Sequence, residues 1–205
     1  MKRHWVFMFA ACLVAAAPAA AQESENAAGR FELAGAPGGG LFFTDSADTG
    51  EPGFGSYAFG GSFTFNFHRY WAVEGDVGVG VGIEQRLTPA SRTLEIAAPP
   101  HMLGYNGALA FYPWTNGRGF APYVLGGLGG LTLFSRDQVG VDGNRTYLTG
   151  NGGAGAKWYL GRWGLRGEYR FFAVDPQEDA PAFFGSGDPR YAHRVTGSVL
   201  LNFSR

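Results

Sequence analysis

The feature that most limits how this chain can fold is a strict two-residue alternation of apolar side chains with small or polar ones. It is clearest at residues 71–83, WAVEGDVGVGVGI, where every odd position except Gly75 is apolar. Successive side chains of a strand point to opposite faces, so this segment is predicted to be a strand with one continuous apolar face. The other face carries Glu74 and Asp76 beside glycines, and the rest of the chain must explain that combination.

The same alternation recurs along the chain, which predicts an all-β protein. Glycine accounts for 34 of 205 residues, and each glycine weakens a helix by about 1 kcal/mol relative to alanine. About ten strand residues tilted at about 45° cross the hydrocarbon core of a bilayer. The predicted strands cover residues 31–43, 56–67, 71–83, 102–112, 121–134, 146–160, 163–172 and 193–203.

The apolar face of each predicted strand is expected to point outward. In the first strand this assignment places Leu41 and Phe43 outside together with Phe31 and Leu33. In the fifth strand the outward set is expected to be Tyr123, Leu125, Leu131 and Leu133.

The segments between the predicted strands alternate between short and long. The short ones are residues 68–70, 113–120 and 161–162, and the long ones are 44–55, 84–101, 135–145 and 173–192. Outer-membrane barrels have this organisation, with short periplasmic turns, long external loops and an even number of strands. The pattern therefore predicts an eight-stranded antiparallel up-and-down transmembrane β-barrel, with a soluble β-sandwich as the alternative.

Large aromatic residues collect at the short-turn ends of the predicted strands. Amphipathic rings are enriched where a membrane meets water, so this clustering predicts a periplasmic aromatic girdle. Its expected members are Trp71, Trp114, Trp158, Trp163, Tyr112 and Tyr123.

The first residues have the organisation of a secretory signal peptide. Lys2 and Arg3 precede the apolar run of residues 5–17, and Ala19-Ala20-Ala21 provides small residues for cleavage. We therefore expect residues 1–21 to be a signal peptide, with a short N-terminal anchor as the alternative, and residues 22–205 to be one barrel domain. Cleavage removes the only cysteine and leaves 14 basic against 17 acidic residues, without the basic excess typical of nucleic-acid binding.

The eight alternating strands, the export signal and the aromatic last strand resemble the OmpA/OmpX-like family of eight-stranded outer-membrane β-barrels. The stretch GAKWYLGRWGLRGEYRFF at residues 155–172 is similar to the hairpin of the sixth and seventh strands of that family. The resemblance implies export through the periplasm of a Gram-negative cell, insertion into outer-membrane lipid and a monomeric barrel. It also implies that the assembly machinery reads the last strand, which here ends at Phe203 followed by Ser204 and Arg205.

The interior of an eight-stranded barrel is just wide enough to be filled by side chains. Counted from the short turns, acids of the third strand and arginines of the seventh lie at matching heights on opposite walls. We therefore predict a buried charge network that plugs the lumen, and a gated polar pathway is the alternative. Its expected members are Glu74, Asp76, Lys157, Arg166, Glu168 and Arg170, with Lys157 among the partners of the two acids of the third strand.

The sequence offers no clear catalytic arrangement. No nucleophile–base pair follows from the positions of His68, His101 and His193, and no Cys/His cluster has the spacing of a metal site. We expect no cofactor and no enzymatic activity, but a non-catalytic envelope or surface role. Phe183 and Phe184 in the last long segment are candidates for contact with an extracellular ligand or adhesion partner, or for packing on the barrel rim. A small-solute, porin-like channel is the second function, and a lipid-modifying enzyme the third.

Overall fold

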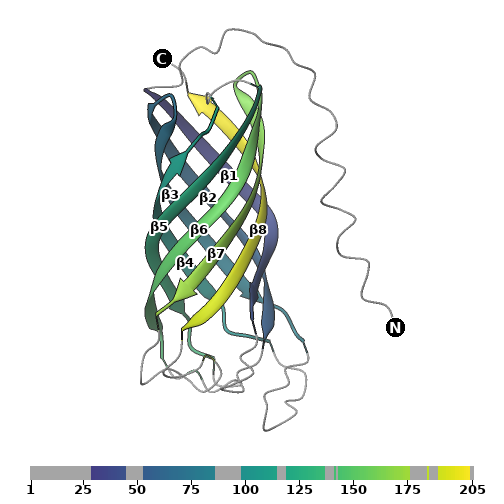
Figure 1. The fold of residues 1–205 in the computed structure, drawn as a ribbon. Coiled ribbons are helices and arrows are strands. Elements are labelled where there is room, and N and C mark those ends of the chain that lie inside the picture. The colour runs from purple at the N-terminus through teal and green to yellow at the C-terminus, as the bar shows by residue number, and fades with distance from the viewer. Residues whose placement is uncertain are drawn as a thin grey trace, which may run out of the picture.

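A computed structural model of the chain describes residues 29–44, 53–85, 98–114, 119–136, 141, 143–175, 184 and 189–203. Eight antiparallel strands form one closed barrel, in which each strand pairs with the next and β8 pairs with β1 (Figure 1). The predicted fold is confirmed, and the strands begin and end within a few residues of the predicted limits. They are β1 (Arg30–Phe43), β2 (Phe54–His68), β3 (Trp71–Gly82), β4 (Met102–Phe111), β5 (Gly119–Leu133), β6 (Arg145–Leu160), β7 (Trp163–Val174) and β8 (Arg190–Phe203).

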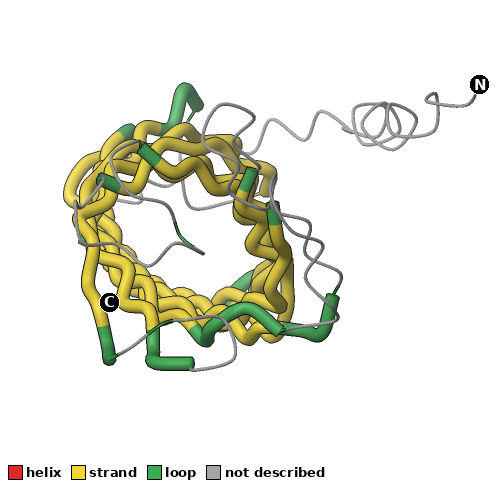
Figure 2. The backbone as a smooth tube through the Cα atoms, turned by 90° about the horizontal axis from the view of Figure 1, so that it is seen from below, coloured by secondary structure: helices red, strands yellow, loops and turns green. Residues whose placement is uncertain are grey.

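The two ends of the barrel differ in the length of chain that connects the strands. At the short-turn end, β6 and β7 are joined by only two residues, and Gly161 there has a φ of 74°, which glycine adopts without strain. At the opposite, long-loop end, the connection between β3 and β4 runs from residue 83 to residue 101. Viewed along its axis, the barrel is a closed ring of strands (Figure 2). The predicted alternation of short and long connections is confirmed.

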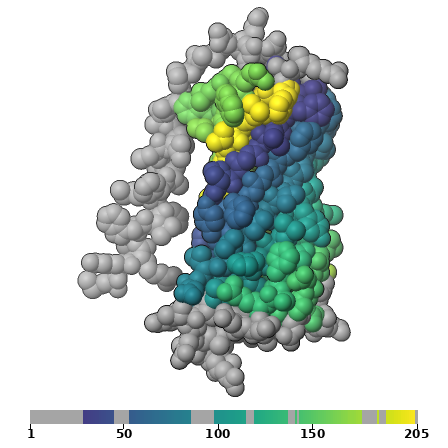
Figure 3. Space-filling view, turned by 180° about the vertical axis from the view of Figure 1, so that it is seen from behind, coloured from purple at the N-terminus to yellow at the C-terminus, as the bar shows by residue number. Residues whose placement is uncertain are grey.

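The outer wall of the barrel is lined with exposed apolar side chains. Figure 3 shows this wall as a cylinder formed by tilted, adjacent strands. Leu33, Val77 and Leu165 are each more than half exposed. Exposure of apolar surface to water costs about 25 cal/mol per Å², whereas the same surface is favourable against lipid.

No helix among the described residues has the length and apolar character needed to cross a membrane.

The prediction for the faces of β5 is wrong. Its predicted outward residues are buried inside the barrel, whereas Val124 and Leu128 are exposed on the outer wall. Both faces of this strand are apolar, so hydrophobicity alone does not distinguish them. The pairing of β5 with β6 distinguishes the two faces, because Ala121 lies opposite the lumen-facing Lys157. Positions two residues apart along a strand share a face, so the odd-numbered residues of β5 also point into the lumen. The residues placed inside are Tyr123, Leu125, Leu131 and Leu133.

The prediction for the second half of β1 is also wrong. Leu41 and Phe43 are buried inside the barrel, although Phe31 and Leu33 on the same strand are exposed. The pairing register with β2 shifts between Ala36 and Gly40, so the strand carries a β-bulge. An extra residue in a strand moves every later side chain to the opposite face.

Four of the six aromatic residues predicted for the girdle are exposed at the short-turn end. They are Trp71, Trp114, Trp158 and Trp163. Tyr112 and Tyr123, in contrast, lie inside the barrel, are almost fully buried and have ring centroids 5.5 Å apart. Their assignment to the girdle is wrong: Tyr123 follows the pairing of β5 with β6 that places Lys157 in the lumen, and Tyr112 lies two residues after the buried Ala110 and so shares its face.

Candidate functional site: the lumen of the barrel

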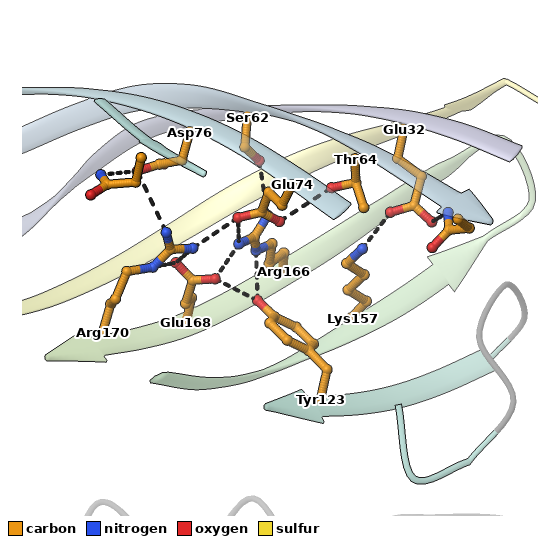
Figure 4. A network of polar contacts seen from close by, with 12 residues as sticks. Glu32, Ser62, Thr64, Glu74, Asp76, Tyr123, Lys157, Arg166, Glu168 and Arg170 are labelled. Atoms are coloured by element: carbon orange, nitrogen blue, oxygen red, sulfur yellow. Dashed lines mark hydrogen bonds and ion pairs between the residues drawn. The ribbon is translucent and has the colours of Figure 1, made fainter. Parts of the chain in front are cut away.

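The short-turn half of the lumen and the middle of the barrel are filled by eight charged side chains, all of which except Arg194 are labelled in Figure 4. We call them the lumen network. All are at most 8% exposed, and the four acids balance the four bases in formal charge. The acids are Glu32, Glu74, Asp76 and Glu168, and the bases are Lys157, Arg166, Arg170 and Arg194.

The centre of the network is an ion pair that crosses the lumen. Arg166 on β7 donates from Nη1 to Oε2 of Glu74 on β3 at 2.8 Å, and from Nη2 to Oε1 at 2.9 Å. These strands are four places apart in the ring of eight, so they form opposite walls. Two parallel hydrogen bonds between a guanidinium and a carboxylate form the strongest common type of ion pair. Arg166 also donates from Nε to the hydroxyl of Tyr123 at 2.7 Å and from Nη1 to the hydroxyl of Ser62 at 2.9 Å.

Glu168 connects three arginines within the same layer. It pairs with Arg166, with Nη2 of Arg170 at 2.8 Å and with Nη2 of Arg194 at 3.5 Å. The Tyr123 hydroxyl donates to Oε2 of Glu168 at 2.8 Å. Arg170 in turn reaches Oε1 of Glu74 at 2.8 Å, so the two carboxylates share their arginine partners.

Asp76 ends the network on the side of the long loops. Nη1 of Arg194 donates to its Oδ1 at 2.8 Å, and the amide of Asn106 donates to the same oxygen at 3.2 Å. Arg194 is absent from the predicted network, although it lies on the lumen face of β8 directly opposite Arg170 on β7. Its position on that face is a signal that could have identified it.

Lys157 has a different partner from the one predicted. Its Nζ lies 2.5 Å from Oε2 of Glu32 on β1, and Glu32 also accepts from Tyr159 at 2.7 Å and from Asn66 at 3.0 Å. The Lys157 ammonium also lies 5.2 Å from the ring centroid of Tyr112. The prediction that it pairs with Glu74 or Asp76 is wrong. Heights counted along tilted strands do not equal heights along the barrel axis, because the pairing rows of a barrel are inclined to that axis.

The long-loop half of the lumen is apolar. Buried side chains from most strands form one cluster there, which we call the apolar cluster. Phe184, from the connection between β7 and β8, is 1% exposed and belongs to it, with ring centroids 5.4 Å from Phe43 and 4.8 Å from Tyr147. Of the roles considered for Phe184, packing on the barrel agrees with the structure and availability for an external ligand does not, because the ring packs inside the barrel mouth. Phe183 lies outside the described residues.

The three histidines among the described residues hydrogen-bond to backbone groups or to a tyrosine. His68 and His101 accept from the backbone N–H groups of Tyr70 and Gly82, and His193 shares a 2.7 Å hydrogen bond with the hydroxyl of Tyr169. No group of metal-ligating side chains occurs among the described residues. The chemistry that this arrangement supports is closure of the lumen by paired charges.

Comparison with known proteins agrees with this architecture. Residues 7–203 match the model of a family described as outer membrane protein beta-barrel domain. No curated protein sequence gives a significant match to the chain.

Three solved structures share the fold at low sequence identity. The N-terminal β-barrel domain of OprF from Pseudomonas aeruginosa is 15% identical, with a TM-score of 0.53, and the match covers 87% of this chain and 100% of that one. OprG from the same organism is 16% identical, with a TM-score of 0.53, over 87% and 97% of the two chains. Ail of Yersinia pestis, in complex with the heparin analogue sucrose octasulfate, is 12% identical with a TM-score of 0.51, over 86% and 99%.

Proposed function

The chain belongs to the outer membrane protein β-barrel domain family, and from this premise we propose that it is a plugged, non-catalytic envelope protein of the outer membrane. The observation that carries the proposal is the bidentate ion pair between Arg166 and Glu74, which spans the lumen from wall to wall. A solute moving along the axis would have to separate this pair and leave two buried charges without their partners, which is strongly unfavourable.

Charge balance within the network supports the same role. The eight charges of the lumen network sum to zero, so the network itself offers no net charge to a permeating ion, and Ser62, Thr64 and Tyr123 occupy further hydrogen-bonding positions. At the long-loop end, the apolar cluster with Phe184 adds a second layer that disfavours water.

Conductance across a planar lipid bilayer tests the plug. We expect purified protein to give no steady, resolvable conductance, whereas the triple variant Glu74→Ala, Arg166→Ala, Phe184→Ala should conduct because it removes the pair without leaving a lone charge and also removes the ring that caps the long-loop end. Val77→Ala on the outer wall is the matched control, because its side chain is exposed to lipid and makes no lumen contact. Steady conductance from the wild-type protein would overturn the plug.

A small-solute channel is the second candidate function. It is favoured by one feature of the network: Nη1 of Arg170 is buried without a hydrogen-bond partner among the described residues, and its ion-pair contact with Oδ1 of Asp76 is long, at 3.7 Å. An arginine with a spare donor can exchange partners, which a gated polar pathway requires. The same bilayer recording separates the two functions, and under the channel hypothesis replacing Glu74 and Asp76 by alanine should change an existing wild-type conductance.

We also propose that the long connections provide contacts to an extracellular ligand or adhesion partner. Functional residues concentrate in loops held by a rigid scaffold, and all the long connections leave the same end of this barrel. Adhesion of cells that carry the intact protein should fall when residues 180–187 are deleted. Phe184→Ala is the control, because it removes the ring that caps the lumen but keeps the rest of the loop. Unchanged adhesion after the deletion would contradict the proposed role of this loop.

A lipid-modifying enzyme is the third candidate, and the occupied histidines disfavour it. Phosphatase or deacylase activity of intact vesicles above that of vesicles lacking the protein would contradict the proposed non-catalytic role.

A further inference from the structure

The connections at the two ends of the barrel differ in charge as well as in length. The connections at the long-loop end contain eleven acidic residues against three basic ones. Those at the short-turn end contain three basic residues and no acidic one. The basic residues of the short connections are Arg69, Arg118 and Arg162, of which the structure describes the first and the last. The short-turn end is therefore a positively charged rim, and such a surface attracts anionic partners.

Arg162 lies at the boundary between the lipid-facing wall and the turn that joins β6 to β7. Its side chain is exposed, and its backbone carbonyl accepts a hydrogen bond from the N–H of Asn202 at 2.8 Å, which ties the turn to β8. Leu160 and Trp163, on either side of the turn, are 62% and 59% exposed on the outer wall. Tryptophan rings are enriched at the level of the lipid headgroups, so the Arg162 guanidinium lies close to the lipid phosphates.

Arg69 has the same position on the opposite side of the ring. The turn between β2 and β3 is four strands away from the turn between β6 and β7 in a ring of eight. Arg69 is exposed, and the central carbon of its guanidinium lies 4.5 Å from the centroid of the Tyr70 ring. Trp71 follows on the outer wall, with its ring 4.8 Å from that of Phe111. The rim thus has two separate places where an exposed arginine lies beside a lipid-facing tryptophan.

The positive charge of these two arginines is not neutralised by the barrel. The acids of the strands at this end, such as Glu32, face the lumen and pair with the bases there. Among the described residues, neither Arg69 nor Arg162 has an acidic side chain within ion-pair distance. A guanidinium offers a planar fork of N–H donors that matches the oxygens of a phosphate group. Both side chains are therefore available to an external anion.

The position of the rim favours a lipid over a soluble anion. A headgroup beside Trp71 or Trp163 is already held there by its acyl chains, so its binding costs less translational freedom than that of a free ion. A phosphatidylcholine headgroup carries its own cation and is neutral overall. The attraction therefore selects lipids with a net negative charge.

We propose that Arg69 and Arg162 form two binding sites for the headgroup of an anionic phospholipid, with the neighbouring tryptophan in contact with the lipid chain. Short turns of outer-membrane barrels lie on the periplasmic side, so the lipids concerned are those of the inner leaflet. These sites go beyond the plug, because they concern the outer rim of the barrel and not its lumen.

Fluorescence quenching by brominated lipids in vesicles tests each site separately. In a variant that retains Trp163 and has phenylalanine at every other tryptophan position, quenching reports the lipid next to Arg162. Phosphatidylglycerol with brominated acyl chains should bind there about fivefold more tightly than brominated phosphatidylcholine, which equals about 1 kcal/mol for one arginine at a membrane surface. Arg162→Gln should lower this preference to less than about twofold, and about 0.5 M NaCl should do the same by screening.

Arg69→Gln is the matched control for this reporter, because Arg69 lies on the opposite side of the ring and its loss should leave the preference at Trp163 unchanged. A second reporter variant that retains Trp71 alone should respond to Arg69→Gln and not to Arg162→Gln. Equal affinity of the two lipids at both reporters, or a preference that survives removal of the adjacent arginine, would overturn the proposal. Inorganic phosphate added at constant ionic strength should have no effect, and abolition of the preference by it would assign the rim to a soluble anion instead.

Discussion

Replacement of Glu74 by alanine should destabilise the barrel far more than any single change on its outer wall. Glu74 accepts both hydrogen bonds of the Arg166 fork, a further one from Arg170 and one from Thr64. These bonds share one carboxylate, so their energies do not add as independent contributions. The relevant magnitude is the cost of breaking a buried pair by removing one partner, about 3–5 kcal/mol.

The structure also explains why the truncation cannot be compensated locally. Without Glu74 the lumen network carries four bases against three acids. Arg166 keeps Glu168, but that carboxylate already accepts from Arg170 and Arg194. The excess positive charge remains buried without a counter-ion, and this is why removing Glu74 should cost about 3–5 kcal/mol.

Equilibrium unfolding by urea in lipid vesicles, followed by tryptophan fluorescence, measures the effect. The free energy of unfolding should fall by about 3–5 kcal/mol for Glu74→Ala, and Glu74→Gln should lose less because it keeps an acceptor oxygen. Val77→Ala, on the lipid-facing side of the same strand, should change it by less than about 1 kcal/mol.

A double-mutant cycle with Arg166→Ala separates the pair from its surroundings. The coupling energy between Glu74 and Arg166 should reach about 2–3 kcal/mol, because the contact is direct and buried. If Glu74→Ala lowers the free energy of unfolding no more than Val77→Ala does, the ion pair contributes no more than an exposed one, and the stabilising role of the buried pair is refuted. A coupling near zero would refute it equally.

Three further changes test other parts of the lumen. Lys157→Met leaves Glu32 without its cation and should lower the free energy of unfolding by about 3–5 kcal/mol in the same urea assay; a loss below about 1 kcal/mol would contradict a buried pair. Gly155→Ala places a Cβ 2.5 Å from the hydroxyl of Tyr123, so the ring must move, and a crystal structure of this variant with Tyr123 unmoved would refute the close contact. Phe184→Ala should cost about 3 kcal/mol on urea unfolding if the ring is packed as described, and no measurable cost would mean that it does not cap the barrel.

The sequence predicts β3 and β7 well because their alternation is strict and each begins at a short turn. Alternation alone therefore places the acids of β3 and the arginines of β7 on the lumen face and at similar heights. The charge pairs Glu74–Arg166 and Asp76–Arg170 follow from that placement.

Other parts of the lumen depend on information that alternation does not contain. The faces of β5 are both apolar, so the position of Tyr123 inside the barrel is fixed only by pairing with β6. The bulge near Ala36 in β1 reverses the later faces, and no residue pattern there gives its register. The partner of Lys157 depends on strand tilt, and the burial of Phe184 depends on how a long connection folds back.

The direction of the lumen pairs suggests what they add to a closed barrel. Ladder hydrogen bonds in the wall join only neighbouring strands, and they leave the shape of the cross-section free to flatten. The Arg166–Glu74 pair joins opposite walls, and Lys157–Glu32 and Arg194–Asp76 add links between strands that are not neighbours. Apolar side chains could fill the same space with equal or better stability, but without fixed distances between particular strands. The network therefore holds opposite walls of the barrel at fixed distances. Its loss should widen the range of cross-sectional shapes of the barrel even where unfolding remains cooperative.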